Sequence, residues 1–322
     1  MKRFEYASGI QSEITIAKEI LSLFLKAKRS ISHCSETCDY CQNPHLNKVR
    51  SSVKNNQPVE LVLPAFPGKS PNTNKVLGHL PDLAEEKSLK FLNSICEKVK
   101  KIYSPGARII ICSDGRVFSD VVGMKESHVT EYQDEIDSMI AKLNLKNLST
   151  YNMDELASNK TFDQVRSELV LNYGREIERI RTEVKSGLNN KRFSELHRMY
   201  CGLVKFLVED ALSPEMTKSK SQIQKESRKK AYLMIQRSNA WTRLIAEKFP
   251  HAVRLSIHPQ DCGSEKLGIQ LLGTETWMTP WHGVAVKIDH EFVLMKRWQA
   301  QELGAVLIHN KKGRPSHFEV RV

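Results

Sequence analysis

The sequence predicts an α/β fold with a Rossmann-like parallel or mixed sheet, flanking helices, a helical middle segment and a β-rich C-terminal part. Two short apolar runs, at residues 59–63 and 108–112, have the composition of buried strands, and each is followed by a polar loop. A segment with helical spacing lies between them. Strand, helix and strand with short joins predict a right-handed unit of parallel strands. Because no clear boundary divides the sequence, we predict a single domain over residues 1–322.

The N-terminal third supplies the elements of this unit. Apolar residues recur at helical spacing over residues 12–28 and predict an amphipathic helix. A polar, cysteine-rich loop is expected at residues 33–45. After the first strand, Asp82 and Glu85 have the spacing of a helix-capping box, and Pro105 with Gly106 ends the helix that they open.

The middle of the chain is predicted to be mostly helical over residues 151–250. Within it, the polar stretch 218–230 is expected to be the most flexible part, and helical spacing resumes at residues 231–249. The last 70 or so residues alternate short apolar runs with turns. They predict strands at residues 253–257, 268–272, 283–288, 292–295 and 305–309.

Charge and cysteine content narrow the class of protein. The chain carries a formal net charge of +12 and contains no apolar run long enough to span a membrane. Its seven cysteines are mostly scattered, which favours reduced thiols in a cytoplasmic protein. The charge fits a solvated surface, an anionic small substrate or nucleic acid. The basic run 218–230 lacks the aromatic side chains that nucleic-acid binding favours, so we expect no nucleic-acid partner.

A loop rich in proline, glycine and lysine follows the first strand. It offers cations and hydrogen-bond donors at close spacing in Lys69, Ser70, Asn72 and Lys75. Three prolines and two glycines restrict its backbone, so these side chains could be preorganised for a phosphate or carboxylate. The spacing is not that of a P-loop. The alternative is a rigid surface turn with solvated lysines.

Polar residues also follow the second strand. Asp114 is a candidate base or hydrogen-bond acceptor for an amine, and Arg116 is a candidate clamp for an oxyanion. The alternative is an Asp-Gly turn with a local ion pair between the two side chains.

Two histidines lie in unusual surroundings near the C-terminus. Arg254, Ser256 and His258 alternate onto one face of a predicted strand. His282 follows Trp281, where an imidazole could act as general acid–base and the indole could stack on an aromatic ligand. Each histidine alone is also compatible with an ordinary core or surface position.

Several of these segments, taken together and in this order, resemble one known family. They are Pro64-Ala65-Phe66-Pro67-Gly68-Lys69-Ser70-Pro71-Asn72, Lys75-Val76-Leu77-Gly78, Leu80-Pro81-Asp82, Ser113-Asp114-Gly115-Arg116-Val117-Phe118-Ser119-Asp120, Arg254-Leu255-Ser256-Ile257-His258-Pro259 and Pro280-Trp281-His282-Gly283. The similarity is to the pyoverdine/dityrosine biosynthesis family, which includes the isonitrile synthases, and it extends from about residue 30 to the C-terminus.

The resemblance implies a reaction without a redox cofactor. The amine of L-tyrosine or L-tryptophan would condense with the C2 ketone of ribulose 5-phosphate, and the ketone carbon would become the isonitrile carbon after C–C cleavage and loss of phosphate. A downstream iron- and 2-oxoglutarate-dependent oxygenase is an implied pathway partner. N-formylation of tyrosine, by a member of the same family, is the nearest alternative.

Roles for the candidate residues follow from this implied reaction. Lys69, Lys75 and Arg116 are predicted to surround the phosphate of the sugar. The acid–base groups are predicted to be Asp114, His258 and His282, converging on one cleft with Lys69 and Arg116. The predicted substrate-binding set is Lys69, Ser70, Asn72, Lys75, Arg116, Arg254 and Trp281.

The cysteine cluster is a separate feature. Cys34, Cys38 and Cys41, with His45 or His33, have the spacing of a structural zinc site. The same CxxxCxxC spacing resembles the iron–sulfur motif of radical S-adenosylmethionine enzymes, but no Gly-Gly-Glu segment follows it. The third alternative is three reduced cysteines in a loop.

Overall fold

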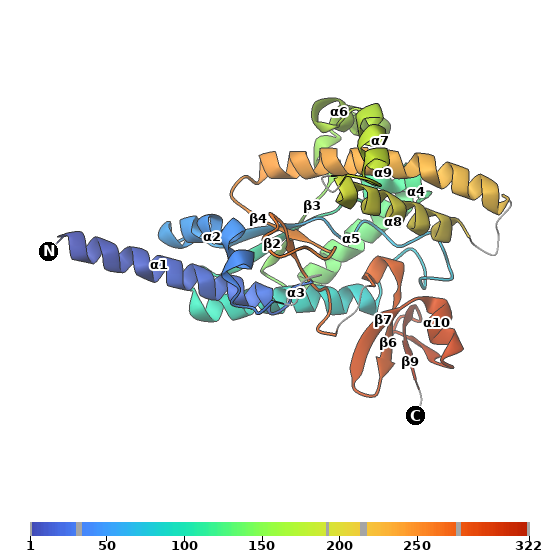
Figure 1. Cartoon of the computed structure of the whole chain (residues 1–322). Helices are drawn as coiled ribbons and strands as arrows, with labels where there is room; N and C mark the ends of the chain where they lie inside the picture. The colour runs from blue at the N-terminus through green and yellow to red at the C-terminus, as the bar shows by residue number, and fades with distance from the viewer. Residues whose placement is uncertain (1, 30–33, 191–192, 213–217, 275–277, 321–322) are drawn as a thin grey trace.

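The computed structural model describes residues 2–29, 34–190, 193–212, 218–274 and 278–320 (Figure 1). The helices are α1 (Lys2–Leu25), α2 (Asp39–Lys54), α3 (Leu83–Ile102), α4 (Gly115–Val122), α5 (Glu126–Lys142), η1 (Met153–Leu156), α6 (Phe162–Tyr173), α7 (Ile177–Ser186), α8 (Ser194–Ala211), α9 (Lys220–Lys248), η3 (Pro280–His282) and α10 (Arg297–Glu302). The strands are β1 (Val59–Leu63), β2 (Ala107–Cys112), β3 (Leu148–Tyr151), β4 (Val253–Ser256), β5 (Leu267–Gly268), β6 (Val284–Ile288), β7 (Glu291–Met295), β8 (Val306–His309) and β9 (Pro315–Glu319).

A five-stranded parallel sheet forms the centre of the fold. Its strand order is β3-β2-β1-β4-β5, and every recorded pairing within it is parallel. The chain moves outward from β1 through β2 to β3 and then returns to the other side of β1 at β4. The strand order therefore reverses between β1 and β4, and in open α/β sheets ligands bind beyond the carboxyl ends of the strands at such a point. The predicted α/β fold with a parallel sheet is confirmed.

Helices cover both faces of this sheet. On β1, Leu61 and Leu63 belong to a core cluster that includes residues of α1 and α3. Val62 points to the opposite face and packs in a cluster with Trp241 of α9 and Val165 of α6. Figure 1 shows α9 running along one side of the sheet, with α1 and α3 on the other. Alternation along the strand thus produces two separate cores.

The C-terminal part forms a second, mixed sheet. Its strand order is β7-β6-β9-β8, with β6 and β9 parallel and the other two pairings antiparallel. In Figure 1 this sheet lies beside the N-terminal end of α3. Leu272 and Leu294 share a small apolar cluster with Ala84 of α3, so the second sheet is packed directly against the first helix of the parallel unit.

Three predictions of local structure were wrong or incomplete. Most of the expected loop 33–45 is helical, because α2 begins at Asp39 and includes Pro44, a residue that normally argues against a helix. The stretch 218–230 is the first part of α9, which Ser219 and Gln222 open with a capping box. The expected strand 268–272 is reduced to Leu267–Gly268. No helix in the described ranges is both long enough and apolar enough to cross a membrane.

Candidate active site

Loops from three neighbouring strands meet at the carboxyl edge of the parallel sheet. The loop after β1 begins at Pro64, the segment after β2 at Ser113, and the segment after β4 at Ile257. Ser113 Oγ donates a hydrogen bond to the Phe66 carbonyl at 2.8 Å. This contact joins the first two segments next to the point where the strand order reverses.

Gly115 allows the start of α4 to approach the loop after β1. A Cβ atom at this position would lie 1.8 Å from the Pro67 carbonyl oxygen, so a larger residue cannot fit without moving the backbone. Phe66 has a φ of 56°, in the left-handed region that bulky residues rarely adopt. Its ring packs against Trp281 with 5.2 Å between centroids. The loop is therefore held in a strained conformation by its neighbours.

Lys69 lies in a buried ionic cluster at the start of α3. Its Nζ donates hydrogen bonds to Asp82 Oδ2 and to the Pro280 carbonyl, both at 2.9 Å, and lies 2.9 Å from Glu85 Oε2. Tyr132 donates a hydrogen bond to Glu85 Oε1 at 3.1 Å. Burial raises the pKa of Glu85 to about 7. The predicted capping box of Asp82 and Glu85 is confirmed, and its carboxylates also neutralise Lys69.

The other polar residues of the loop are bound to the end of α8. Lys75 donates a hydrogen bond to Asp210, and Ser70 Oγ donates one to the same carboxylate at 3.0 Å. The Asn72 side-chain amide donates to the Glu209 carbonyl at 3.0 Å. All four residues predicted to bind substrate from this loop are buried and bonded within the protein: Lys69, Ser70, Asn72 and Lys75.

Arg116 points away from this loop. Its guanidinium pairs with Glu126 at 2.8 Å and Asp154 at 3.2 Å, and it lies 4.0 Å from the centroid of the Phe162 ring. Within the described ranges, no hydrogen bond or ion pair joins it to residues 64–81. The structure therefore does not bring Arg116 to Lys69.

Trp281 is also placed differently from the expectation. Its side chain is 2% exposed and belongs to the hydrophobic core, where it packs against Phe66. The indole packs against the loop and presents no exposed face on which a ligand could stack.

His282 and His258 are the two candidate histidines, and His258 contributes to the lowered pKa of His282. Thr279 Oγ1 is 3.0 Å from His282 Nδ1, and the His282 ring is 4.8 Å from that of Phe206. Burial lowers the pKa of His282 to about 3, and Lys75, His258 and Lys69 add to this effect. Desolvation by the surrounding protein, followed by the charges of Arg29 and Lys266, lowers the pKa of His258 as well, although this residue is exposed. Both imidazoles are thus neutral near pH 7, in a strongly positive environment.

Asp114 has an unusually free carboxylate. It occupies the N-cap position of α4 but makes no side-chain capping hydrogen bond. Burial raises its pKa to about 7, and within the described ranges no other side chain is recorded as its partner. A carboxyl group that is half ionised near neutral pH can both donate and accept a proton. Its position between Ser113 and Gly115 places it beside the loop after β1.

Four cysteines form a candidate metal centre on the α2 side of the sheet. The ligand atoms of Cys34, Cys38, Cys41 and Cys262 all lie within 4.8 Å of one another. The Sγ distances from Cys262 to the other three are 3.8, 3.6 and 3.0 Å. Tetrahedral zinc with bonds of about 2.3 Å requires sulfur atoms about 3.8 Å apart, so the cluster could hold a metal such as zinc.

The fourth ligand in this cluster corrects the prediction of His45. Cys262 reaches the other cysteines from the loop between β4 and β5, and no sequence spacing near residues 34–41 could indicate it. His45 is buried in α2 outside the set, and burial lowers its pKa to about 4. His33, the alternative ligand, lies outside the described residues.

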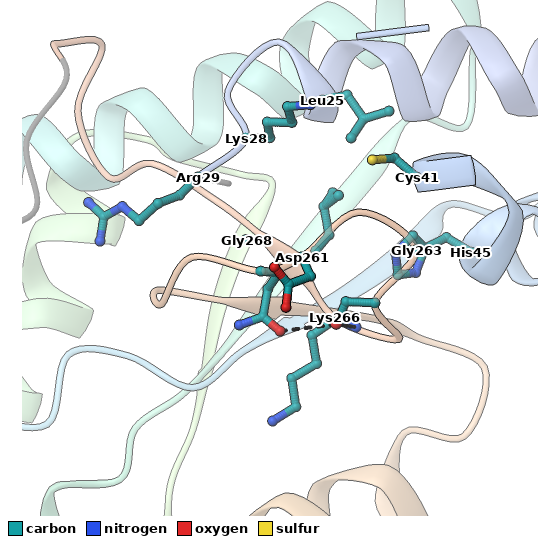
Figure 2. Close-up of a pocket in the computed structure, with 12 residues that line it drawn as sticks. Leu25, Lys28, Arg29, Cys41, His45, Asp261, Gly263, Lys266 and Gly268 are labelled. Atoms are coloured by element: carbon teal, nitrogen blue, oxygen red, sulfur yellow. Dashed lines mark hydrogen bonds between the residues drawn. The ribbon is translucent and has the colours of Figure 1, made fainter. Parts of the chain in front are cut away.

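A hollow lies beside this cluster. Figure 2 shows Cys41 and Lys28 at one side of it and Lys266 extending away from both. Lys28 Nζ donates a hydrogen bond to Cys34 Sγ at 2.6 Å, which lowers the pKa of the Cys34 thiol. The loop from His258 to Lys266 thus joins β4 to β5 and contributes Cys262 to the cysteine cluster.

Comparisons with known proteins relate nearly the whole chain to one protein family. The profile of the family described as pyoverdine/dityrosine biosynthesis protein matches residues 49–308. The chain is 44% identical over 313 residues to the L-tryptophan isonitrile synthase AmbI2 of Fischerella ambigua, covering 96% of this chain and 92% of the relative. It is 42% identical to an L-tyrosine isonitrile synthase of Xenorhabdus nematophila, covering 95% and 92%.

The fold has a close match among solved structures. The crystal structure of the PvcA protein from Pseudomonas aeruginosa superposes with a TM-score of 0.89 at 38% sequence identity, covering 95% of this chain and all of the other. The same overall architecture therefore extends through both sheets.

Proposed function

The chain belongs to the pyoverdine/dityrosine biosynthesis protein family, and from this membership we propose that it is an isonitrile synthase acting on the amine of L-tyrosine or L-tryptophan. We propose ribulose 5-phosphate as the carbon donor. The observation that carries the proposal is the likeness of more than nine-tenths of the chain to isonitrile synthases for each of these amino acids.

The proposed reaction begins with attack of the amine on the C2 ketone of the sugar. This step forms a carbinolamine, which loses water to give an imine. Cleavage of both C–C bonds of the former ketone carbon, with loss of phosphate from the released sugar carbons, then leaves it as the isonitrile carbon. The protein must accept a proton from the amine, donate one to the departing hydroxyl and hold two anionic substrates in register.

The groups at the carboxyl edge of the sheet suit these demands. His282 is neutral at pH values near 7, so its ring can accept a hydrogen bond from the attacking amine, although a pKa lowered to about 3 makes it a weak base. Asp114, with its pKa raised to about 7, can donate a proton to the departing hydroxyl and recover it afterwards. His258 contributes to the lowered pKa of His282. We assign it to orienting the sugar between His282 and Asp114.

We assign a structural role to the four-cysteine cluster. Zinc held by Cys34, Cys38, Cys41 and Cys262 would fix the loop between β4 and β5 to the segment that precedes α2. A site with four cysteine ligands leaves zinc no open position, as is usual for structural zinc. We expect catalysis itself to require no bound cofactor. An iron- and 2-oxoglutarate-dependent oxygenase is the expected partner that takes up the product.

The test is incubation of the purified protein with ribulose 5-phosphate and either amino acid. We expect a product with the mass of the amino-acid isonitrile and the infrared band of the N≡C group. Omission of the sugar phosphate should abolish this product. An N-formyl amino acid as the only product, or no product from either amino acid, would overturn the assignment.

A further inference from the structure

The basic side chains of the loop after β1 and those of the β4–β5 strand pair differ in whether their charge is already balanced. Lys69 is paired with Asp82 and Glu85, and Lys75 with Asp210. Among the residues that the structure describes, Arg254 and Lys266 have no carboxylate within ion-pair distance and no side-chain hydrogen bond. Both are half-buried, so their charges are neither fully hydrated nor neutralised.

These two unpaired cations lie side by side. Arg254 is in β4, and Lys266 immediately precedes β5. The parallel register pairs Leu255 with Leu267, so the residues before them are neighbours across the two strands. Burial lowers the pKa of Lys266, and the charge of Arg254 lowers it further. Glu265 attracts both cations and Glu195 attracts Lys266, but neither carboxylate forms an ion pair with them.

Two half-buried positive charges side by side repel each other and gain stability when an anion binds between them. A third cation, Lys48, adds to this effect. Its Nζ donates a hydrogen bond to the Ala252 carbonyl at 2.8 Å, and the charge of Arg254 contributes to lowering the pKa of Lys48. The same charges act on the histidines. Lys266 contributes to the lowered pKa of His258, and His258 contributes to the lowered pKa of His282.

We propose that Arg254 and Lys266 bind the phosphate of the phosphorylated carbon donor, an inference that rests on the proposed function. A phosphate monoester carries close to two negative charges at pH 7, which matches this pair better than the single charge of an amino-acid carboxylate. The planar guanidinium of Arg254 suits two phosphate oxygens at once, and Lys266 supplies a point charge for a third. With the phosphate at this end, the sugar carbonyl would reach toward His258 and His282.

The experiment measures binding separately from catalysis. Calorimetric titrations with inorganic phosphate, with ribulose 5-phosphate and with L-tyrosine are compared for the wild type, Arg254→Gln and Lys266→Gln. Lys98→Gln, which removes one charge from an exposed position on α3, is the matched control. We expect each of the first two variants to bind phosphate and the sugar phosphate at least about tenfold more weakly, with tyrosine affinity unchanged. Arg254→Lys and Lys266→Arg keep the charge and should retain most of the affinity.

The outcomes separate this proposal from the proposed function. Retained phosphate affinity in both glutamine variants, or a loss of tyrosine affinity in place of phosphate affinity, overturns the phosphate assignment even if the wild type makes an isonitrile. A wild type that binds no phosphate also overturns it. Selective loss of phosphate binding in the two variants supports the subsite even if no isonitrile forms, in which case only the proposed function fails. Equal thermal unfolding midpoints show that the variants are folded.

Discussion

The loop after β1 and the strand pair β4–β5 both carry basic side chains, but only the loop neutralises them. Lys69 and Lys75 are buried against Asp82, Glu85 and Asp210. Arg254 and Lys266 have no carboxylate at that distance among the described residues. A lysine in a buried ion pair holds the fold together, whereas an unpaired, half-buried cation is available to a ligand.

The difference shows that a lysine-rich segment does not by itself indicate unpaired cations. The loop has the more suggestive sequence, with two lysines, a serine and two asparagines within seven residues. Its partners come from α3 and from the end of α8, and they use up the donors that a substrate would need. Arg254 and Lys266 are 12 residues apart, and only the pairing of β4 with β5 brings them together.

The strongest way to break this comparison is to remove a loop lysine. Lys69→Met leaves Asp82 and Glu85 buried without their counter-charge, and we expect a loss of about 3–5 kcal/mol in the free energy of unfolding. Denaturant titration measures the loss, and Lys266→Met, which leaves no buried carboxylate unpaired, is the matched control. If both variants were equally stable, Lys69 would not have the structural role described here.

A second prediction concerns the role of His282 in catalysis. His282→Asn should lower kcat/KM at least about a hundredfold with little change in stability, because the neutral imidazole orients the attacking amine through a hydrogen bond. In the wild type, the limb of the pH–rate profile near pH 7 should come from Asp114, since the pKa of His282 is lowered to about 3. Activity within tenfold of the wild type would remove His282 from the mechanism.

The next prediction concerns the cysteine cluster, which binds the loop between β4 and β5. Metal analysis of the wild type should find about one zinc per chain, and Cys262→Ser should lose the metal and lower the thermal unfolding midpoint, because metal binding is coupled to folding. Phosphate affinity should fall as well, since Cys262 lies between His258 and Lys266 on the same loop.

The control for this test is His45→Ala, which should keep the zinc because His45 is outside the ligand set. A wild type that contains no metal and keeps full stability in the presence of chelator would contradict the zinc assignment.

Much of this arrangement could be predicted from sequence where the determining contacts are local. The strand at residues 59–63 and the capping box of Asp82 and Glu85 are confirmed, because apolar runs and capping distances are properties of a few neighbouring residues. The sequence could not show that the same carboxylates also neutralise Lys69, since a capping box alone accounts for their positions.

Contacts between distant segments account for what the sequence could not indicate. Cys262 joins a cluster that lies 221 residues away from it at Cys41. Asp210 binds Lys75 across 135 residues. The first part of the helix at residues 220–248 has a buried face formed by Ile223, Ser227 and Ala231. Only one of these is a large apolar residue, so the sequence there shows little helical periodicity of apolar residues.

A separate prediction concerns the pH dependence of the Lys69 cluster. The pKa of Glu85 is raised from 4.5 to about 7 in the folded chain, so the folded state binds a proton that the unfolded state has lost between these pH values. Stability is therefore fully present below pH 4.5 and decreases as the pH rises toward 7, by up to about 1.4 kcal/mol per pH unit. Glu85→Gln should remove this dependence. An equal slope in both proteins would refute the raised pKa.

The origin of the isonitrile carbon tests the central claim most directly. Ribulose 5-phosphate labelled with carbon-13 at C2 is incubated with the wild-type protein and the accepted amino acid, and the product is analysed by mass spectrometry and carbon NMR. We predict that the label appears in the product, at the isonitrile carbon alone. An isonitrile formed without the label, or with the label elsewhere in the molecule, would contradict it.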